Sequence, residues 1–215
     1  MVFKLLLGIW MSAVIVVAFL YAPAAEGFAQ PDAARIIFFH VPNAIVAAIA
    51  FIVAAVYAVM HLHSRSLMDD AKSAASAELG LVFTALATIT GSIFAHIQWN
   101  SWWNWDPRET AIIILLLVYL AYFALRTAVD APDKRASLSA VYAILALPAM
   151  VFLMFIMPRV MFSLHPQDTL ISEGKLDITY RLVLYPAILG FIGLYVWLFR
   201  IRTALAEIKL KMRRN

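Results

Sequence analysis

The residues best suited to chemistry in this sequence are tryptophans that crowd one short stretch. The stretch WNSWWNWDPRET, at 99–110, holds four of the chain's six tryptophans within seven positions: Trp99, Trp102, Trp103 and Trp105. Indole is a common anchor at membrane interfaces, because its apolar ring and its N–H suit opposite sides of that boundary. Four indoles so close together would cover more than one face of a single helix. The pattern therefore favours a platform or clamp around a flat aromatic guest over a simple anchor.

Two histidines are candidate metal ligands beside these tryptophans. His40 lies in RIIFFHVPNA and His165 in VMFSLHPQDT, far apart in the chain. A single histidine at a helix end is commonly a hydrogen-bonded interfacial residue. Two on the same surface as an aromatic platform could instead bind a metal from opposite sides. Both interpretations stay open from the sequence alone.

The guest that suits these side chains is haem. Indoles would pack on the flat macrocycle, and two imidazoles could reach the iron from opposite faces. Arg35, five residues before His40, and Arg108, two after Asp106, could each hold a propionate in a bidentate geometry. The alternative for each arginine is a solvated interfacial charge with its stem lying along apolar surface.

The elements that must position these residues are membrane helices. The chain is 64% hydrophobic and 14% charged over 215 residues, well above the apolar share of a soluble domain. A bilayer core needs about 20 apolar residues per helix. Six runs meet that need, at 4–23, 38–62, 80–98, 109–126, 138–157 and 179–200. The sequence predicts an all-α membrane bundle of six transmembrane helices that forms a single domain over residues 1–215.

The first run also resembles a secretory signal, because Lys4 precedes it and the small residues of YAPAAEG follow it. Its apolar segment from Leu5 to Tyr21 is longer than the typical signal core of about 7–15 residues. We expect a membrane helix that is not cleaved.

Basic residues predict how the bundle is oriented, because Lys and Arg are enriched on the cytoplasmic side. Five lie on the side opposite the termini: Arg35, Arg108, Arg159, Lys175 and Arg181. Twelve lie on the side of the termini: Lys4, Arg65, Lys72, Arg126, Lys134, Arg135, Arg200, Arg202, Lys209, Lys211, Arg213 and Arg214. We therefore expect both termini in the cytoplasm. The basic tail from Arg200 would lie on anionic lipid, in preference to binding nucleic acid.

This topology places loops 24–37, 99–108 and 158–178 on the outward side. His40, His165 and the tryptophan-rich loop at 99–109 would then share one membrane surface. His61 and His63 would lie at the cytoplasmic end of the second helix, where an interfacial role is the simplest. The chain has no cysteine for a thioether or a disulfide. It also has no phosphate-binding G-x-x-x-x-G-K-[ST] run, so any ATP hydrolysis belongs to a partner.

The segment WNSWWNWD resembles the tryptophan-rich motif W-G-x-x-W-x-W-D of the haem-handling proteins of cytochrome c maturation. Trp99, Trp103, Trp105 and Asp106 fill its fixed places. The approach TGSIFAHIQW and the contexts HVP and LHP around the two histidines are also similar. Within that superfamily, the length, the six spans and the lack of a large extra domain are most similar to the CcmC family.

The resemblance implies a function and partners. Haem b would sit between the tryptophan loop and the helix ends, with His40 and His165 as axial ligands and Arg35 and Arg108 at positions that contact propionates. The protein would lie in the bacterial inner membrane with this site facing the periplasm. It would present haem to a CcmE-like chaperone, together with ABC-type CcmA- and CcmB-like subunits and a small CcmD-like protein. It would have no independent catalytic activity.

Some features depart from the motif or leave a role open. Asn100 replaces its glycine, which predicts a less close approach of the backbone to the guest. His96, just before the motif, could compete as an iron ligand. Asp106 could contact haem or an indole N–H, or it could cap the fourth helix, where Pro107 suits the first turn.

Three rival functions remain from the sequence. The continuation WDPRET is similar to the larger haem ligases CcmF and CcsA, but those carry further histidines within membrane helices. A b-type cytochrome electron-transfer subunit would likewise need histidines inside facing helices. A transporter could use Pro148, Pro158 and Pro186 as helix breaks, but it would leave the tryptophans unexplained.

Overall fold

The computed structural model describes residues 2–25, 28–165 and 176–212, and helices dominate these ranges. The elements are α1 (Val2–Leu20), the short 3-10 helix η1 (Pro31–Ile36), α2 (Ile37–Ser64), α3 (Leu67–Trp99), α4 (Pro107–Ala128), α5 (Pro132–Val151), the π-helical turn η2 (Phe152–Ile156), α6 (Met157–Val160) and α7 (Ile178–Met212). No strand occurs within these ranges. The predicted all-α class is confirmed.

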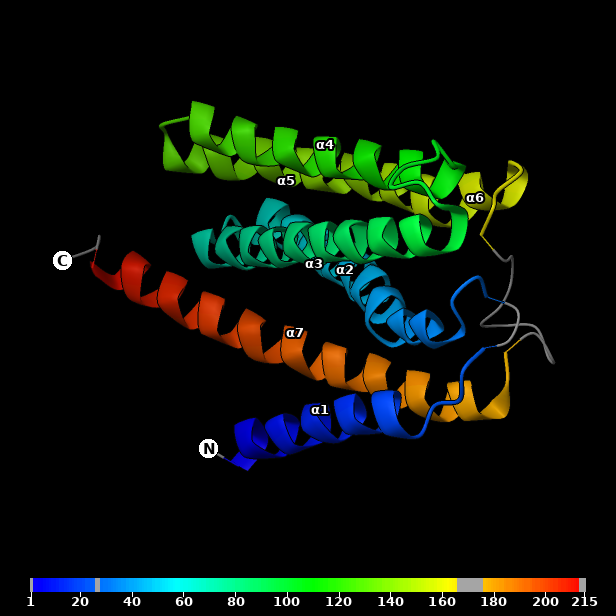
Figure 1. The fold of residues 1–215 in the computed structure, drawn as a ribbon. Helices are drawn as coiled ribbons and strands as arrows, with labels where there is room; N and C mark the ends of the chain where they lie inside the picture. The colour runs from blue at the N-terminus through cyan, green and yellow to red at the C-terminus, as the bar shows by residue number, and fades with distance from the viewer. Residues whose placement is uncertain (1, 26–27, 166–175, 213–215) are drawn as a thin grey trace.

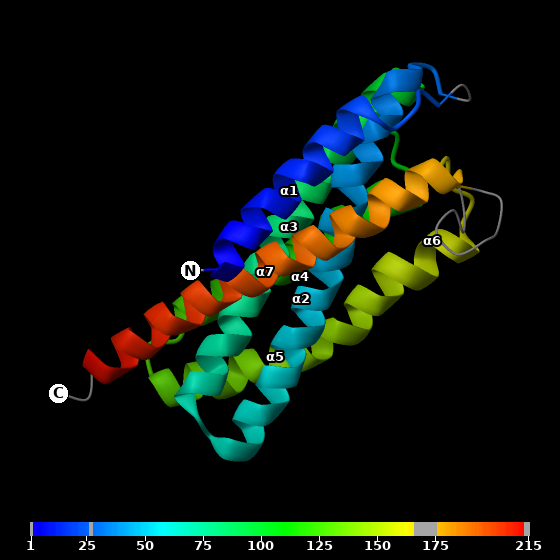
Figure 2. The same ribbon diagram turned by 90° about the horizontal axis from the view of Figure 1, so that it is seen from below.

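Six of these helical segments are long and apolar enough to cross a membrane. They are Val2–Leu20, Pro31–Ser64, Leu67–Trp99, Pro107–Ala128, Pro132–Val160 and Ile178–Met212, so the six predicted spans are confirmed. Figures 1 and 2 show them as a bundle in which the start of α1 and the end of α7 lie at the same end. Which membrane face that end occupies stays a prediction.

Two helices, α3 and α7, extend furthest beyond the apolar runs that predicted them. The third begins at Leu67 instead of residue 80, because its charged first turns are capped and packed. Ser66 caps this helix by accepting the backbone N–H of Asp69, and Asp70 is buried. The basic tail continues α7 without a break through Met212. Its contact with anionic lipid stays a prediction.

Small residues hold the centre of the bundle together. The hydroxyls of Ser73 and Ser76 on α3 donate to backbone carbonyls of α2, at 2.8 and 2.6 Å. A Cβ at Gly80 would lie 2.4 Å from the Phe51 ring, so glycine is what lets α2 and α3 approach. Phe51 in turn stacks on Tyr119 of α4 with ring centroids 3.6 Å apart. Close packing and interhelical hydrogen bonds replace the hydrophobic effect as the cohesive force between membrane helices.

The first helix packs on the last. The Trp10 indole N–H donates to the carbonyl of Pro186 at 2.9 Å, and Met11 packs against Gly190. Such side-chain contacts are those of a bundle helix. Pro186 lies inside α7, which continues well past it, whereas α5 gives way to the π-helical turn η2 four residues after Pro148.

Candidate functional site

The end of the bundle opposite the termini gathers the predicted site residues. His40 lies in the first turn of α2, Trp99 ends α3, and Asp106 precedes α4. His165 follows α6, and the π-helical turn η2 joins α6 to the end of α5. Figure 1 shows these helix ends on one side of the molecule.

The backbone between α3 and α4 turns back through two residues with positive φ. Asn100 (φ 55°) terminates α3 in the left-handed conformation, and Trp105 (φ 56°) precedes the next helix. Asparagine is one of the few residues besides glycine that adopts this conformation readily. Asn100 therefore ends α3 in a conformation that the glycine of the motif would also adopt readily.

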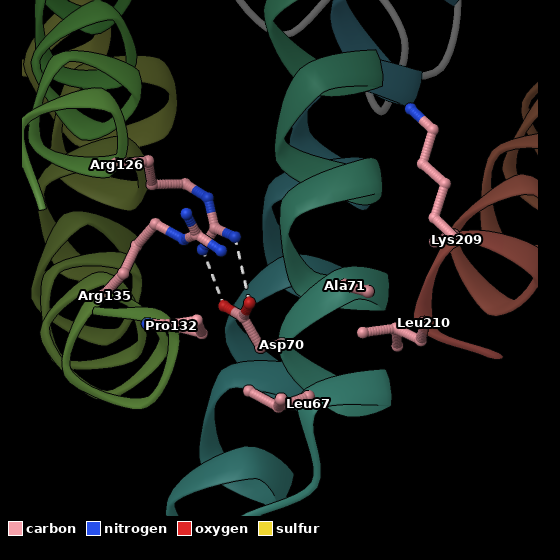
Figure 3. Close-up of a pocket in the computed structure, with 9 residues that line it drawn as sticks. Leu67, Asp70, Ala71, Arg126, Pro132, Arg135, Lys209 and Leu210 are labelled. Carbon is pink, nitrogen blue, oxygen red and sulfur yellow. Dashed lines mark hydrogen bonds and ion pairs between the residues drawn. The ribbon is translucent and has the colours of Figure 1, made fainter. Parts of the chain in front are cut away.

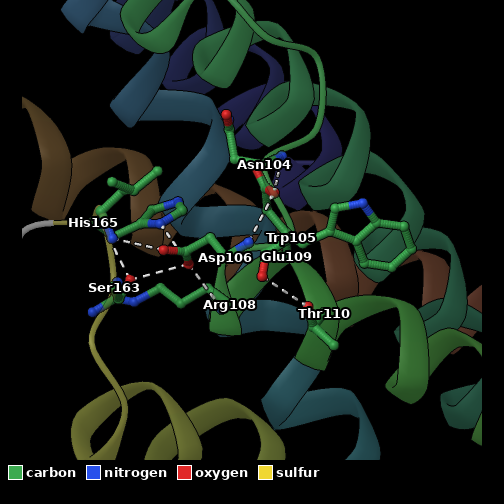
Figure 4. A network of polar contacts seen from close by, with 9 residues as sticks. Asn104, Trp105, Asp106, Arg108, Glu109, Thr110, Ser163 and His165 are labelled. Carbon is green, nitrogen blue, oxygen red and sulfur yellow. Dashed lines mark hydrogen bonds and ion pairs between the residues drawn. The ribbon is translucent and has the colours of Figure 1, made fainter.

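Asp106 caps α4 through a reciprocal capping box (Figure 4). Its carboxylate accepts the backbone N–H of Arg108 at 2.9 Å, while the Glu109 carboxylate accepts the backbone N–H of Asp106 at 3.3 Å. Glu109 also accepts the N–H of Asn104 at 2.6 Å, which ties the loop to the helix. The predicted capping role of Asp106 is confirmed.

The same carboxylate also holds the segment that carries His165 (Figure 4). Asp106 accepts the Ser163 hydroxyl at 3.0 Å, the Leu164 N–H at 2.6 Å and His165 Nδ1 at 3.1 Å. Burial would raise the pKa of this carboxyl, but the hydrogen bonds from Arg108, Leu164 and Ser163 hold it below its usual value. Asp106 is therefore a buried anion that joins α4 to the segment after α6.

Burial lowers the pKa of the His165 imidazole, against the opposing effect of the Asp106 charge. The ring is therefore neutral near pH 7. Because a carboxylate only accepts hydrogen bonds, Nδ1 must carry the proton, which leaves the lone pair on Nε2. The Trp99 indole packs edge-on against this ring at a centroid distance of 5.0 Å. His165 thus has the fixed tautomer of an imidazole ligand oriented by a carboxylate.

His40 is fixed in the same way by the backbone of α3. Its Nδ1 lies 3.1 Å from the carbonyl of Ala87 and 3.2 Å from the Thr90 hydroxyl. A carbonyl only accepts, so Nδ1 is again the donor and Nε2 keeps its lone pair. The ring rests on Gly91, where a Cβ would lie 2.9 Å from His40 Cε1. His165 and Arg108 both lie within electrostatic range of His40.

The four tryptophans do not share one helix. Trp99 belongs to α3, and the other three lie in the loop that follows. Trp102 stacks on His96 with ring centroids 4.1 Å apart and planes within 3°. Trp103 meets Trp105 edge-to-face at 6.2 Å. Trp102 is 57% exposed and Trp105 is 75% exposed, so the loop presents two large indoles on the surface.

The two candidate arginines lie in different surroundings. Arg108 follows Asp106 and is within electrostatic range of both His40 and His165. Arg35 pairs with Asp32 at 2.9 Å and donates to the carbonyl of Ala22. The structure thus brings Arg108 to the histidines, whereas Arg35 is engaged with the connection between α1 and α2.

The remaining histidines have other contacts. His61 is buried at the opposite end of the bundle, where its Nδ1 lies 2.8 Å from the Ser66 carbonyl in the turn between α2 and α3. His63 is exposed near that turn. Within the described ranges, no group of three or more His, Asp or Glu side chains forms a site for a bare metal ion.

Sequence reasoning missed several residues that build this end of the bundle. Glu109 was detectable, because an acidic residue three positions after Asp106 is the spacing of a capping box. Thr90 and Gly91 belong to the TGSIFAHIQW stretch before the motif, but the sequence predicts no contact for either of them. Ser163 and the backbone of Leu164 carry no sequence signal, since their partner lies 57 and 58 residues away.

The chain is similar over its whole length to one protein family. The model of the family described as CcmC, Heme exporter protein C, matches residues 1–215. A Haemophilus influenzae protein named Heme exporter protein C is 30% identical over 204 residues, which cover 88% of this chain and 76% of that protein.

Two further relatives carry the same name. The Paracoccus denitrificans protein is 37% identical over 92 residues, 43% of this chain. The Escherichia coli K12 protein is 38% identical over 96 residues, 45% of this chain. In both, the match spans 38% of the relative's own length.

Proposed function

Because the chain belongs to the CcmC (Heme exporter protein C) family, we propose that it holds haem for cytochrome c maturation at the membrane surface opposite its termini. Haem would be its cargo, and His40 and His165 would be the axial ligands. The carrying observation is that both imidazoles have Nδ1 fixed by an acceptor, a tautomer that keeps the lone pair on Nε2 for iron.

The surrounding residues have distinct tasks in this proposal. Asp106 fixes the ring plane and tautomer of His165, and Ala87, Thr90 and Gly91 do the same for His40. Trp99, Trp102, Trp103 and Trp105 supply indole surface for the macrocycle. Arg108 is the arginine best placed for a propionate, whereas Arg35 would need to leave Asp32 to reach one.

We further propose that haem b is bound in the inner membrane with the site on the periplasmic side and both termini in the cytoplasm. A CcmE-like chaperone would collect the haem, with CcmA-, CcmB- and CcmD-like subunits as partners. Two fixed imidazoles saturate the iron, so this chain controls the reactivity of haem and leaves bond formation to the acceptor.

A ligase of the CcsA or CcmF type remains the alternative, suggested by the continuation WDPRET. The structure supplies another reason for part of that string, because Pro107 and Glu109 serve the cap of α4. His61 and His63 do not resemble the second histidine pair expected of a ligase, because His61 is buried near the end of α2 with Nδ1 on the Ser66 carbonyl and His63 is exposed.

The test is the optical spectrum of the full chain, purified in detergent from haem-replete cells. We expect a six-coordinate haem spectrum that becomes five-coordinate, or is lost, in His40→Ala and in His165→Ala. His96→Ala tests the competing ligand, and His63→Ala is the matched control, since it removes an exposed histidine at the far end of the bundle.

Retention of the six-coordinate spectrum by both ligand variants, or its loss only in His96→Ala, would refute the assignment. Added imidazole should restore six-coordination to His40→Ala and His165→Ala if the missing group is an axial ligand. A variant that failed for lack of folding would not recover with imidazole.

A further inference from the structure

A small cavity lies at the opposite end of the bundle from the candidate haem site. It has a volume of about 160 Å³ and lies where α3, α4, α5 and α7 meet near the termini. Nine residues line it: Leu67, Asp70, Ala71, Arg126, Pro132, Arg135, Ala206, Lys209 and Leu210. The lining combines basic side chains with aliphatic ones, and the proposed function uses none of them.

The one carboxylate in this lining is already neutralised (Figure 3). Asp70 of α3 receives Arg126 of α4 in a bidentate ion pair, with N–O distances of 2.6 and 2.9 Å. Both side chains are largely buried. This planar pairing uses both oxygens of the carboxylate. Asp70 therefore offers little compensation to any other cation beside it.

Arg135 is such a cation. Its guanidinium extends from α5 to lie beside that of Arg126 (Figure 3), and its Nε is buried with no hydrogen-bond partner among the described residues. Lys209 lines the same cavity from α7. Two guanidinium groups thus share one carboxylate, while the exposed Lys209 adds a third positive charge to the lining. A buried guanidinium N–H without an acceptor is costly. An anion at this point would relieve both.

We propose that this cavity binds a phosphate-bearing anion, and that an acidic phospholipid supplies it. The cavity lies at the ends of membrane-spanning helices, where lipid headgroups gather. Basic pockets between such helices are suited to anionic headgroups. Leu67, Ala71 and Leu210 provide the apolar surface that a glycerol backbone and its chains would contact, whereas a free phosphate would leave that surface unused.

The test is native mass spectrometry of the full chain in neutral detergent, titrated with phosphatidylglycerol, with phosphatidylcholine and with inorganic phosphate in separate experiments. We expect one tightly retained phosphatidylglycerol, with an affinity about tenfold weaker in Arg135→Gln. Lys134→Gln is the matched control, because it removes the same charge from an exposed neighbour. Neither substitution removes a partner of the ion pair between Asp70 and Arg126.

Each outcome decides the proposal. Equal retention of phosphatidylglycerol by the wild type, Arg135→Gln and Lys134→Gln would overturn it, as would equal retention of phosphatidylcholine. Binding of inorganic phosphate that depends on Arg135, without binding of lipid, would support the anion site and replace its occupant. Thermal unfolding of each variant confirms that it is folded.

Discussion

The two ends of the bundle each bury a carboxylate, and they stabilise it by opposite means. Asp70, near the termini, is paired with the permanent cation Arg126. Asp106, at the other end, receives two backbone N–H groups, a hydroxyl and a neutral imidazole. The first arrangement cancels the charge and locks α3 to α4. The second leaves a negative charge that is shared among weak donors.

The difference separates a structural anion from one that can orient a ligand. In the bidentate pair both carboxylate oxygens are bound by the guanidinium, so the carboxylate cannot orient another group. The Asp106 carboxylate polarises the imidazole of His165 while also capping α4. Its several partners explain how one residue can serve both purposes, because the backbone donors offset its burial without neutralising it.

The largest expected effect is on the structural anion. Arg126→Gln would leave Asp70 buried without its cation, and we expect a loss of about 3–5 kcal/mol in stability. Thermal unfolding in detergent measures it. The double variant Arg126→Gln with Asp70→Asn should recover most of the loss. If Arg126→Gln were as stable as the wild type, the pair between Asp70 and Arg126 would not have the structural role that distinguishes it from Asp106.

The next effect falls on the orienting anion. Asp106→Asn removes the charge that orients His165, and we expect haem affinity to fall by about 10–100-fold. Transfer of haem to a haem-free globin acceptor measures this change. Asparagine is also a good helix cap, so the loss of thermal stability should be smaller than that of Arg126→Gln. An unchanged transfer rate would assign Asp106 to the cap alone.

A smaller effect is expected where His40 rests on α3. Gly91→Ala would place a Cβ 2.9 Å from His40 Cε1, so the imidazole must tilt. We expect a penalty of about 1 kcal/mol, or roughly a fivefold loss of haem affinity. Gly8→Ala is the control, because a Cβ there meets nothing within 4 Å. Equal spectra and affinities in the two variants would indicate that His40 is not an iron ligand.

The smallest effect concerns pH. Since burial lowers the pKa of His165, its neutral form persists below the usual value of about 6.5. Lowering the pH from about 7.5 to about 6.5 should therefore leave the haem spectrum unchanged, because only the neutral ring ligates. Optical titration of the loaded protein checks this. A transition within that interval, with the midpoint shifted in His165→Ala, would contradict the lowered pKa of His165.

The fold was largely predictable because its signal is local. A membrane span is read from about 20 consecutive apolar residues, and all six spans were found in this way. The prediction was wrong about the start of α3 by 13 residues, because Asp70 of the polar extension is stabilised by Arg126, a partner 56 positions away. A span predicted from consecutive apolar residues ends at the first charged ones, even where a distant residue neutralises that charge in the fold.

The sequence by itself determined the membrane class, the motif at 99–106 and the sharing of one bundle end by His40, His165 and the tryptophans. Only the tertiary structure decided which atoms of those residues are engaged. The Nδ1 acceptors of His40 and His165 lie 47 and 59 positions away. The tautomers, and with them the nitrogen that each imidazole would offer to iron, therefore depend on how α2, α3, α4 and the segment after α6 pack together.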